Sequence, residues 1–223
     1  MEKYNYRKDP HQDIDHVFRD LLPAHGMVER PAQVELSHQM LDAMLNGSIA
    51  LCDAGTGIGK TYAYLVAGVV FRRYRSRAGL PNQPLLISTS SIALQGAIIH
   101  DYLPFLSKVM MADGMLDSPL RAVLRKGKSH YVCDARLMKR LQTANLDRKN
   151  PLAKAALLSM RDHLDLDMAP HLSGYDRERI CVPPTCDCGK TECRYLCYLD
   201  VCVSERYAIQ VCNHNLLLAD AIH

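Results

Sequence analysis

The sequence lacks the hydrophobic segments that would place a protein in or across a membrane. It has no run of about 18 apolar residues, the length that a transmembrane helix needs. Its first residues, MEKYNYRKDPHQDIDHVF, are polar and contain no apolar core of a secretory signal. We therefore predict a cytoplasmic protein with no membrane partner. Internal repeats and low-complexity segments are also absent, and 223 residues suffice for one buried core with a small second module.

Cysteine, by contrast, is abundant, with nine residues in the chain and six of them within 22 positions. The six are Cys181, Cys186, Cys188, Cys193, Cys197 and Cys202. In a reducing compartment this crowding predicts metal or cluster binding rather than disulfides. Spacing alone leaves zinc and an iron–sulfur cluster open, because both accept closely spaced thiolates. His163 and His171 are candidate ligands too, but isolated histidines in a polar segment are more often solvated. Cys52 and Cys212 fall in apolar runs, and we expect them to be buried.

Positive charge is concentrated in one part of the chain. Residues 121–149 contain nine Lys or Arg and two Asp, a local charge of +7, whereas the remainder is near −4. This asymmetry predicts a surface for a polyanion, and a solvated charged helix is the alternative.

The order of apolar and polar segments predicts an α/β fold with a parallel sheet, because strand, loop and helix alternate along the first part. Strands are expected at residues 48–52, 85–88 and 207–212. Helices are expected at residues 29–45, 61–74, 92–110 with a bend at Pro104, 135–141, 152–164 and 214–222. A cysteine-rich loop is expected between residues 181 and 202.

Residues 54–61, AGTGIGKT, match the Walker A pattern with alanine at the first position. Glycines let backbone N–H groups face phosphate oxygens, and the following helix N-terminus adds a positive dipole end. Lys60 can reach the β- and γ-phosphates, and Thr61 can offer its hydroxyl to Mg²⁺, which makes these two the predicted catalytic residues. ATP and Mg²⁺ are therefore predicted ligands. The predicted nucleotide loop consists of Ala54, Gly55, Thr56, Gly57, Ile58, Gly59, Lys60 and Thr61.

This loop, preceded by Asp53, resembles that of the DinG/XPD-type iron–sulfur DNA helicases of superfamily 2. Three further segments are similar to motifs of the same family. Residues 30–33, RPAQ, resemble the Q-type motif that contacts adenine, which adds Arg30 and Gln33 to the predicted cofactor site. Residues 86–95 resemble motif Ia, which grips the strand backbone. Residues 211–220, VCNHNLLLAD, resemble the segment that re-enters the motor before its carboxylate box.

The resemblance implies a RecA-like P-loop parallel sheet with a mainly helical cysteine-rich insertion. Residues 1–112 would begin the ATPase motor, residues 113–204 would form the insertion, and residues 205–223 would return to the motor. The implied function is an ATP-dependent DNA helicase that translocates 5′→3′, with single-stranded and forked duplex DNA as partners, a monomeric state and a role in DNA repair. No Asp-Glu-x-His box occurs in the sequence, so we expect a fragment that is inactive alone.

The resemblance also bears on the cysteine centre. Residues 126–133, KGKSHYVC, resemble the segment that carries the first cluster cysteine of the family. A [4Fe–4S] cluster takes four thiolates. The implied ligands are Cys133, Cys181, Cys186 and Cys193, with Cys188 and Cys202 as alternates and zinc as the alternative metal.

The basic segment would hold strand phosphates beside the cluster in such a helicase. The candidates are Arg125, Lys126, Lys128, Arg136, Lys139 and Arg140. Tyr131 would either stack on a base or lie in the core. Two alternatives belong to other classes: a zinc-stapled nucleic-acid-binding P-loop module without helicase activity, favoured by the missing carboxylate box, and a metabolic P-loop kinase, which leaves the basic cysteine insertion without a role.

Overall fold

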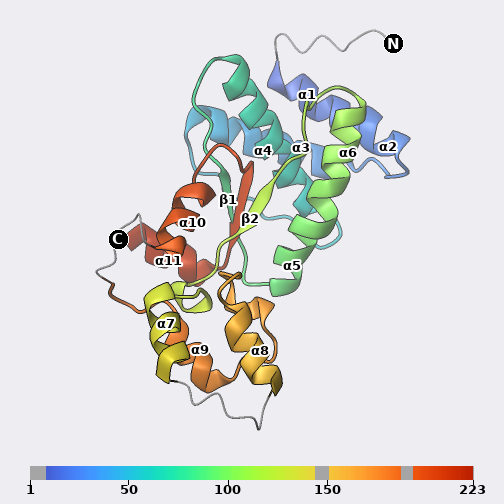
Figure 1. The fold of residues 1–223 in the computed structure, drawn as a ribbon. Coiled ribbons are helices and arrows are strands. Elements are labelled where there is room, and N and C mark those ends of the chain that lie inside the picture. Colours follow the sequence, from blue (N-terminus) through green and yellow to red (C-terminus); the bar gives the residue numbers. More distant parts are fainter. Residues whose placement is uncertain (1–8, 144–150, 187–192, 223) are drawn as a thin grey trace. The chain divides into compact units, whose positions relative to one another are not determined.

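The computed structural model describes residues 9–143, 151–186 and 193–222, and it divides into two compact units (Figure 1). The first unit comprises Met1–Leu124 and Glu205–His214, and the second comprises Arg125–Ser204 and Asn215–His223. Residues 113–124, which the sequence placed in the insertion, fall in the first unit. Within the described ranges, every helix is too short or too polar to cross a bilayer.

The first unit is built on a three-stranded parallel sheet of order β1-β3-β2. The strands are β1 (Leu85–Ser88), β2 (Ala122–Leu124) and β3 (Ile209–Cys212). Ile209 pairs with Leu85 on one side and with Ala122 on the other, so the last strand in sequence is central. The predicted α/β class with a parallel sheet is confirmed, as is the strand at residues 85–88.

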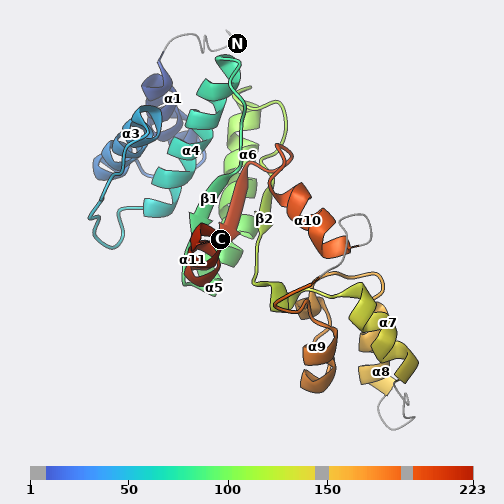
Figure 2. The ribbon, with the colours of Figure 1, turned by 90° about the vertical axis from the view of Figure 1, so that its left-hand side faces the viewer.

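Helices α1 (Pro10–His16), α3 (Pro31–Asn46) and α4 (Lys60–Arg77) lie together beside this sheet (Figure 2). A π-helical turn, Val17–Leu21, and the short α2 (Leu22–Ala24) follow α1. Proline in the first turn suits the start of α3, and Gly47 ends it in the left-handed region with φ of 61°. The sequence predicted α3 and α4 but not α1, which lies before every recognisable motif.

The predicted helix at residues 92–110 forms as α5 (Ile92–Ala97), a π-helical turn (Ile98–Tyr102) and α6 (Leu103–Ala112). Pro104 sits in the first turn of α6, directly after the π turn. Proline has no N–H to donate to the preceding turn, and a wider turn removes the clash of its ring with that backbone. The expected irregularity at Pro104 is therefore a π turn.

One hydrophobic core joins these helices to the sheet. Ile209 and Val211 of β3 are fully buried in it, together with apolar residues of α1, α3, α4 and α6. Ile209 and Val211 point to the same face of the strand, and Gln210 and Cys212 on the other face are buried as well, so β3 is covered on both faces. Gly68 of α4 lies so close to β1 that an added Cβ would approach Leu85 Cδ1 to 2.4 Å. This close approach places α4 directly on the sheet.

The predicted strand at residues 48–52 is wrong. These residues form no strand, and Ile49 and Leu51 are 91% and 96% exposed. Cys52 is likewise exposed rather than buried, whereas Cys212 is buried as predicted. A strand persists only where a neighbouring strand accepts and donates its backbone hydrogen bonds, and none of the three described strands pairs with this segment.

The second unit is mainly helical. Its elements include α7 (Asp134–Thr143), α8 (Pro151–Ser159), α9 (Gly174–Ile180) and α10 (Arg194–Cys202), with single 3₁₀ turns at Lys128–His130 and Leu166–Met168. Helix α11 (His214–Ile222) begins in the first unit and continues into the second. The predicted loop between residues 181 and 202 is wrong in its second half, because α10 occupies residues 194–202.

Two small cores stabilise the second unit, on opposite sides of an isolated antiparallel bridge between Val132 and Cys181. Val132 and partly buried Cys181 pack in a cluster with residues of α7, α8 and α9. Tyr131 and Cys133 pack in the other cluster, against Tyr195 and Tyr198 of α10. Tyr131 is 3% exposed, which supports its reading as a core residue.

A buried ion pair ties α1 to α4, and we predict that its loss destabilises the first unit. Asp13 is 3% exposed in its side chain, and its Oδ2 lies 3.6 Å from Arg73 Nε and 3.3 Å from an Arg77 nitrogen. Asp13→Asn leaves both guanidiniums without their countercharge and should lower the free energy of unfolding by about 2–3 kcal/mol. Urea unfolding followed by far-UV circular dichroism measures this.

The matched control is Asp20→Asn. Asp20 also pairs with a side chain, His16, but is 66% exposed, so its loss should change the free energy of unfolding by less than about 0.5 kcal/mol. Equal effects of the two substitutions would contradict a stabilising role of the Asp13 pair.

Candidate nucleotide site and cysteine centre

The phosphate loop has the backbone shape that its glycines predict. Gly57 and Gly59 have φ angles of 84° and 89°, in the left-handed region that favours glycine. Gly59 directly precedes α4, so the loop delivers the chain to a helix N-terminus. At Gly59 there is also no room for a side chain, because an added Cβ would lie 2.2 Å from Gln33 Nε2. Both constraints make this glycine necessary for the observed loop.

Two side chains of the Q-type segment form hydrogen bonds to the backbone of the phosphate loop. Gln33 is buried, and its Nε2 donates to the Gly59 carbonyl at 2.6 Å. Arg30 Nη1 donates to the Gly57 carbonyl at 2.6 Å. The sequence predicted that these two residues contact a nucleotide. The structure gives them a loop-positioning contact, and the predicted contact with adenine stays a prediction.

Lys60 is the first residue of α4 and points across the loop. Its Nζ donates to the carbonyls of Ala54 and Gly55 at 2.8 and 3.0 Å. These two bonds hold the ammonium against the first residues of the loop. Thr61 follows in the first helical turn and is half-buried. The glycine turns lead directly into the N-terminus of α4, where Lys60 and Thr61 lie, and a helix N-terminus favours bound anions.

The carboxyl ends of β1 and β3 bring a second group of predicted residues together. Ser88 is the last residue of β1, and its Oγ lies 2.7 Å from Nδ1 of His214, which follows β3. Gln95 Nε2 donates to the Thr89 carbonyl at 2.9 Å and fixes the turn into α5. Helix α4 ends near the start of β1, so its first turn lies towards the carboxyl edge of the sheet. Ligands of parallel α/β sheets bind outside this edge.

Several basic side chains of residues 121–149 already form contacts within the second unit. Arg136 donates to the Cys181 and Glu178 carbonyls at 2.7 and 3.0 Å, and so caps the end of α9. Arg140 Nε lies 2.6 Å from buried Asp176. Lys128 donates to the Pro184 carbonyl. These candidate phosphate ligands are thus engaged in holding the second unit together. Lys139 is the exposed exception, without a side-chain hydrogen bond to any described residue.

Lys126 belongs to a tighter network. Its Nζ lies 2.6 Å from Asp165 and 2.7 Å from Asp167, and Asp167 also accepts from Arg177 at 2.8 Å and lies 3.1 Å from His130 Nδ1. Partial burial alone would raise the pKa of Asp167, but the hydrogen bonds from Lys126 and Arg177 outweigh it and hold that pKa far below its usual value. The same carboxylates raise the pKa of Lys126 against the opposing effect of burial.

Cys133 and Cys193 occupy equivalent positions. The Cys133 carbonyl accepts a hydrogen bond from the Leu137 N–H at the start of α7, and Cys193 is the N-cap of α10. The next residues, Asp134 and Arg194, form an ion pair with Nε to Oδ1 at 2.8 Å, which joins the two helix starts. Helix N-termini stabilise thiolates. These two predicted ligands are therefore placed in neighbouring, anion-favouring positions.

Cys181 faces the other way. The bridge between Val132 and Cys181 alternates side chains, so Cys181 packs with the cluster of α7, α8 and α9 while Cys133 faces α10. The Cys181 thiol donates to the Glu178 carbonyl at 3.4 Å. Its role as a ligand stays a prediction, but the backbone does not direct it towards Cys133.

The remaining cysteines differ in exposure. Cys186 and Cys197 are exposed, whereas Cys202 is fully buried, and burial raises the pKa of the Cys202 thiol, with an opposing contribution from Tyr198. Cys188 lies outside the described residues. Cys197 was not among the predicted ligands, although it lies one helical turn after Cys193 and so on the same face of α10. Because the sequence analysis predicted a loop here rather than a helix, it did not show that Cys193 and Cys197 are one turn apart.

The described residues do not complete a metal site. Among them, no group of three or more cysteine, histidine, aspartate or glutamate side chains is arranged to hold a metal ion. A four-thiolate set that used Cys133 and Cys193 would need two further cysteines. Neither zinc nor an iron–sulfur cluster is distinguished by this geometry.

Comparison with curated proteins gives consistent relatives. The chain is 31% identical over 139 residues to the 3′-5′ exonuclease DinG of Bacillus subtilis, which covers 62% of this chain and 13% of the relative. It is 31% identical over 129 residues to the ATP-dependent DNA helicase YoaA of Haemophilus influenzae, and 30% identical over 126 residues to the ATP-dependent helicase DinG of Mycobacterium tuberculosis. These matches cover 58% and 56% of this chain.

The similarity is confined to part of each relative. The chain spans 18% of the length of the second and third relatives, so most of each relative has no counterpart here. No family model matches the chain. At about 30% identity over about half of its length, the chain is similar to the DinG and YoaA helicases, which supports the DinG-type resemblance of its motifs.

We predict that the Asp167 network makes the stability of the second unit depend on pH. A carboxyl group whose folded pKa is depressed contributes stability that is fully present above its unfolded pKa, about 4, and that is lost as pH falls further towards the folded value. The urea midpoint of this unit should therefore begin to decrease as the pH is lowered below about 5 and should go on decreasing through pH 3, and Asp167→Asn should flatten that decrease.

The control for this pH effect is Asp162→Asn. Asp162 is exposed and has no side-chain partner among the described residues, so the substitution should leave the pH profile unchanged. An Asp167→Asn profile that matches the unmodified protein would show that the network does not depend on the carboxylate charge.

Proposed function

We propose that this chain, a relative of DinG-type helicases, carries the ATP-binding part and a strand-contacting part of an ATP-dependent DNA helicase motor. The observation that supports it most directly is the phosphate loop, fixed by Arg30 and Gln33 at the start of α4. The helicase names of the YoaA and DinG relatives agree with it.

ATP would bind with its phosphates on the loop of residues 54–61. The N–H groups of the loop and the dipole of α4 would stabilise the phosphate charge. The Lys60 ammonium, which now donates to two loop carbonyls, would exchange these bonds for the β- and γ-phosphates. The Thr61 hydroxyl would face Mg²⁺ in the next position of the helix.

Single-stranded DNA would lie along the carboxyl edge of the sheet in the same unit. Ser88, Thr89 and His214 present hydroxyl and ring N–H groups there, which suit phosphate oxygens. Such contacts do not read sequence, as a translocating motor requires. A 5′→3′ direction, forked DNA substrates and a cytoplasmic monomer remain part of this proposal by resemblance alone.

The second unit would be stapled by a cysteine centre that includes Cys133 and Cys193. A [4Fe–4S] cluster is the proposal that the resemblance favours, with zinc as the alternative, and either would supply a structural cross-link between α7 and α10. Among the basic candidates, exposed Lys139 is the one best placed to meet phosphates.

The second candidate function is a zinc-stapled nucleic-acid-binding P-loop module without helicase activity. Its zinc site would use the same closely spaced cysteines, since zinc also accepts thiolate ligands. Because the chain spans 18% or less of the relatives named above, hydrolysis and unwinding are proposals for the whole protein, and ATP binding is the property to test on this chain.

Lys60→Ala should weaken ATP binding about 100-fold or more, because an ammonium shared by two phosphates contributes about 3 kcal/mol. Equilibrium binding of ATP in the presence of Mg²⁺ measures this. The matched control is Lys108→Ala, an exposed lysine of α6 whose loss removes the same charge and should change the affinity less than about twofold. Equal affinities of Lys60→Ala and the unmodified protein would remove the phosphate-loop proposal.

Cys133→Ser should remove iron and sulfide from anaerobically purified protein, from about four of each per chain to near zero. ATP binding should persist, because the phosphate loop lies in the other unit. Cys52→Ser, at an exposed cysteine of the first unit, is the control and should keep the full metal content. Stoichiometric zinc without sulfide in the unmodified protein would instead support the zinc-stapled module.

Cys181→Ser separates two ligand sets. Retention of the cluster in this variant would indicate a set built around α10, in which Cys197 accompanies Cys193. Loss of the cluster, as in Cys133→Ser, would support the set that the resemblance implies and would require the segment around Cys181 to turn its thiol towards Cys133.

A further inference from the structure

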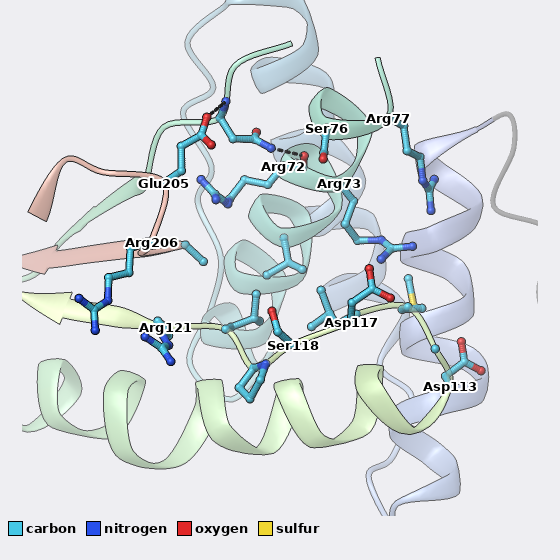
Figure 3. Close-up of a pocket in the computed structure, with 18 residues that line it drawn as sticks. Arg72, Arg73, Ser76, Arg77, Asp113, Asp117, Ser118, Arg121, Glu205 and Arg206 are labelled. Carbon is cyan, nitrogen blue, oxygen red and sulfur yellow. Dashed lines mark hydrogen bonds between the residues drawn. The ribbon is translucent and has the colours of Figure 1, made fainter. Parts of the chain in front are cut away.

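A pocket of about 630 Å³ lies in the first unit, at the amino ends of the sheet strands (Figure 3). It is lined by the last turns of α4, by the loop of residues 113–121 that leads into β2, and by residues 205–208, which lead into β3. Its volume falls in the range of small-molecule sites, about 300–1,000 Å³. None of the predicted nucleotide-loop residues takes part in it.

Helix α4 separates this pocket from the phosphate loop. Lys60 begins the helix and Arg77 ends it, which places them about 26 Å apart along the axis at a rise of about 1.5 Å per residue. The pocket is therefore a different place from the ATP site, at the opposite edge of the sheet. Nothing in the proposed helicase chemistry uses it.

Five arginines line the pocket, and three of them have countercharges. Arg73 and Arg77 share buried Asp13. Arg72 interacts with the charge of Glu205, which also accepts a hydrogen bond from the backbone N–H of Asn82. These contacts build a rigid wall on the α4 side and fix its orientation.

Arg121 and Arg206 are different. Both are exposed, and their side chains make no hydrogen bond or ion pair with any described residue. They lie on adjacent segments, because the Ala208 N–H donates to the Arg121 carbonyl at 2.8 Å. Figure 3 shows both at the same end of the pocket, with Arg72 nearby. Two neighbouring guanidiniums without a countercharge repel each other, and a bound anion relieves that repulsion.

The other end of the pocket carries both charges: Arg73 and Arg77, which are paired with Asp13, lie there together with carboxylates (Figure 3). Asp113, Asp117 and Ser118 lie there (Figure 3). Asp113 is engaged with His16 at 3.2 Å, whereas exposed Asp117 has no side-chain partner among the described residues. A carboxylate accepts hydrogen bonds from hydroxyl and amino groups. The pocket therefore suits a ligand with an anion at one end and hydrogen-bond donors at the other.

We propose that this amino-edge pocket binds a nucleoside monophosphate unit, with its phosphate on Arg121 and Arg206 and its sugar hydroxyl or base amino groups on Asp117. Guanidiniums match phosphate oxygens in a bidentate geometry. A free nucleotide and a nucleotide within a strand offer the same chemistry, and the test distinguishes the two sources.

The test uses the full chain carrying Lys60→Ala, so that the phosphate loop contributes little, with cytidine monophosphate as the probe in equilibrium dialysis. Adding Arg206→Ala or Arg121→Ala should weaken binding about tenfold, as expected for the loss of a charge-assisted phosphate contact. Lys108→Ala, also exposed and in the same unit, removes the same charge away from the pocket and should change the affinity less than about twofold.

Asp117→Asn gives a second readout that a general charge effect cannot mimic. It should weaken the binding of cytidine monophosphate, because the carboxylate acceptor is lost, and leave the binding of inorganic pyrophosphate unchanged or tighter, because a negative charge is removed. Competition by an oligothymidylate of about 12 nucleotides assigns the site to nucleic acid, and lack of competition assigns it to a free nucleotide.

The proposal is overturned if cytidine monophosphate does not bind, or if Lys108→Ala weakens it as much as Arg206→Ala does. Either result leaves the ATP site untouched, since that site is tested by Lys60→Ala with ATP. Conversely, a failure of ATP binding would not affect the amino-edge pocket.

Discussion

The central position of β3 is the constraint on which the first unit depends. β1 and β2 do not pair with each other, so both satisfy their ladder hydrogen bonds through β3. Between β2 and β3 the chain makes the long excursion Arg125–Ser204. Closing a loop of this length costs about 4 kcal/mol of chain entropy. The burial of Ile209 and Val211 offsets it, since each fully buried aliphatic side chain contributes about 1.5–3 kcal/mol.

The pairing of β2 with β3 holds the two ends of the segment Arg125–Ser204 close together. The second unit is then stabilised by contacts within itself. These contacts involve few apolar residues and many ionic ones. Asp165 and Asp167 hold Lys126, and Asp176 holds Arg140. A small unit with limited core gains order from such hydrogen-bonded networks. The high positive charge of residues 121–149 is therefore partly a structural requirement and not only a surface for a polyanion.

Helix α4 gives the first unit two chemically different edges. Its N-terminus faces the phosphate loop, where the dipole favours anions, and its last turns carry arginines that complement the negative end. The structure adds specific partners: Arg73 and Arg77 pair with Asp13, while Arg75 donates to the Pro81 carbonyl at 2.7 Å. Arg73 and Arg77 also form part of one wall of the amino-edge pocket, whereas Arg75 does not line it.

The sequence correctly predicted elements whose formation depends on local signals. It failed for elements whose formation depends on contacts with residues far away in the chain. Helix α3, helix α4 and β1 carry strong caps, glycine turns or apolar runs, and each appears close to its predicted bounds. Residues 48–52 carry a good strand pattern, yet a strand needs a neighbour, and the described sheet gives it none. The engagement of Arg136 and Arg140 was equally invisible, because their partners lie about 40 residues away.

The choice of cysteine ligands also depends on contacts that the sequence alone does not reveal. The family resemblance implied Cys181, Cys186 and Cys193 as companions of Cys133, but which thiols can share a metal depends on the faces that they occupy. The bridge at Val132 turns Cys181 away from Cys133, and the ion pair between Asp134 and Arg194 draws the start of α10 towards it. Because residues 194–202 are helical, Cys193 and Cys197 share a face. The α10 residues that pack with Cys133 are Tyr195 and Tyr198, so exposed Cys197 lies on a different face of the helix from the one that contacts Cys133.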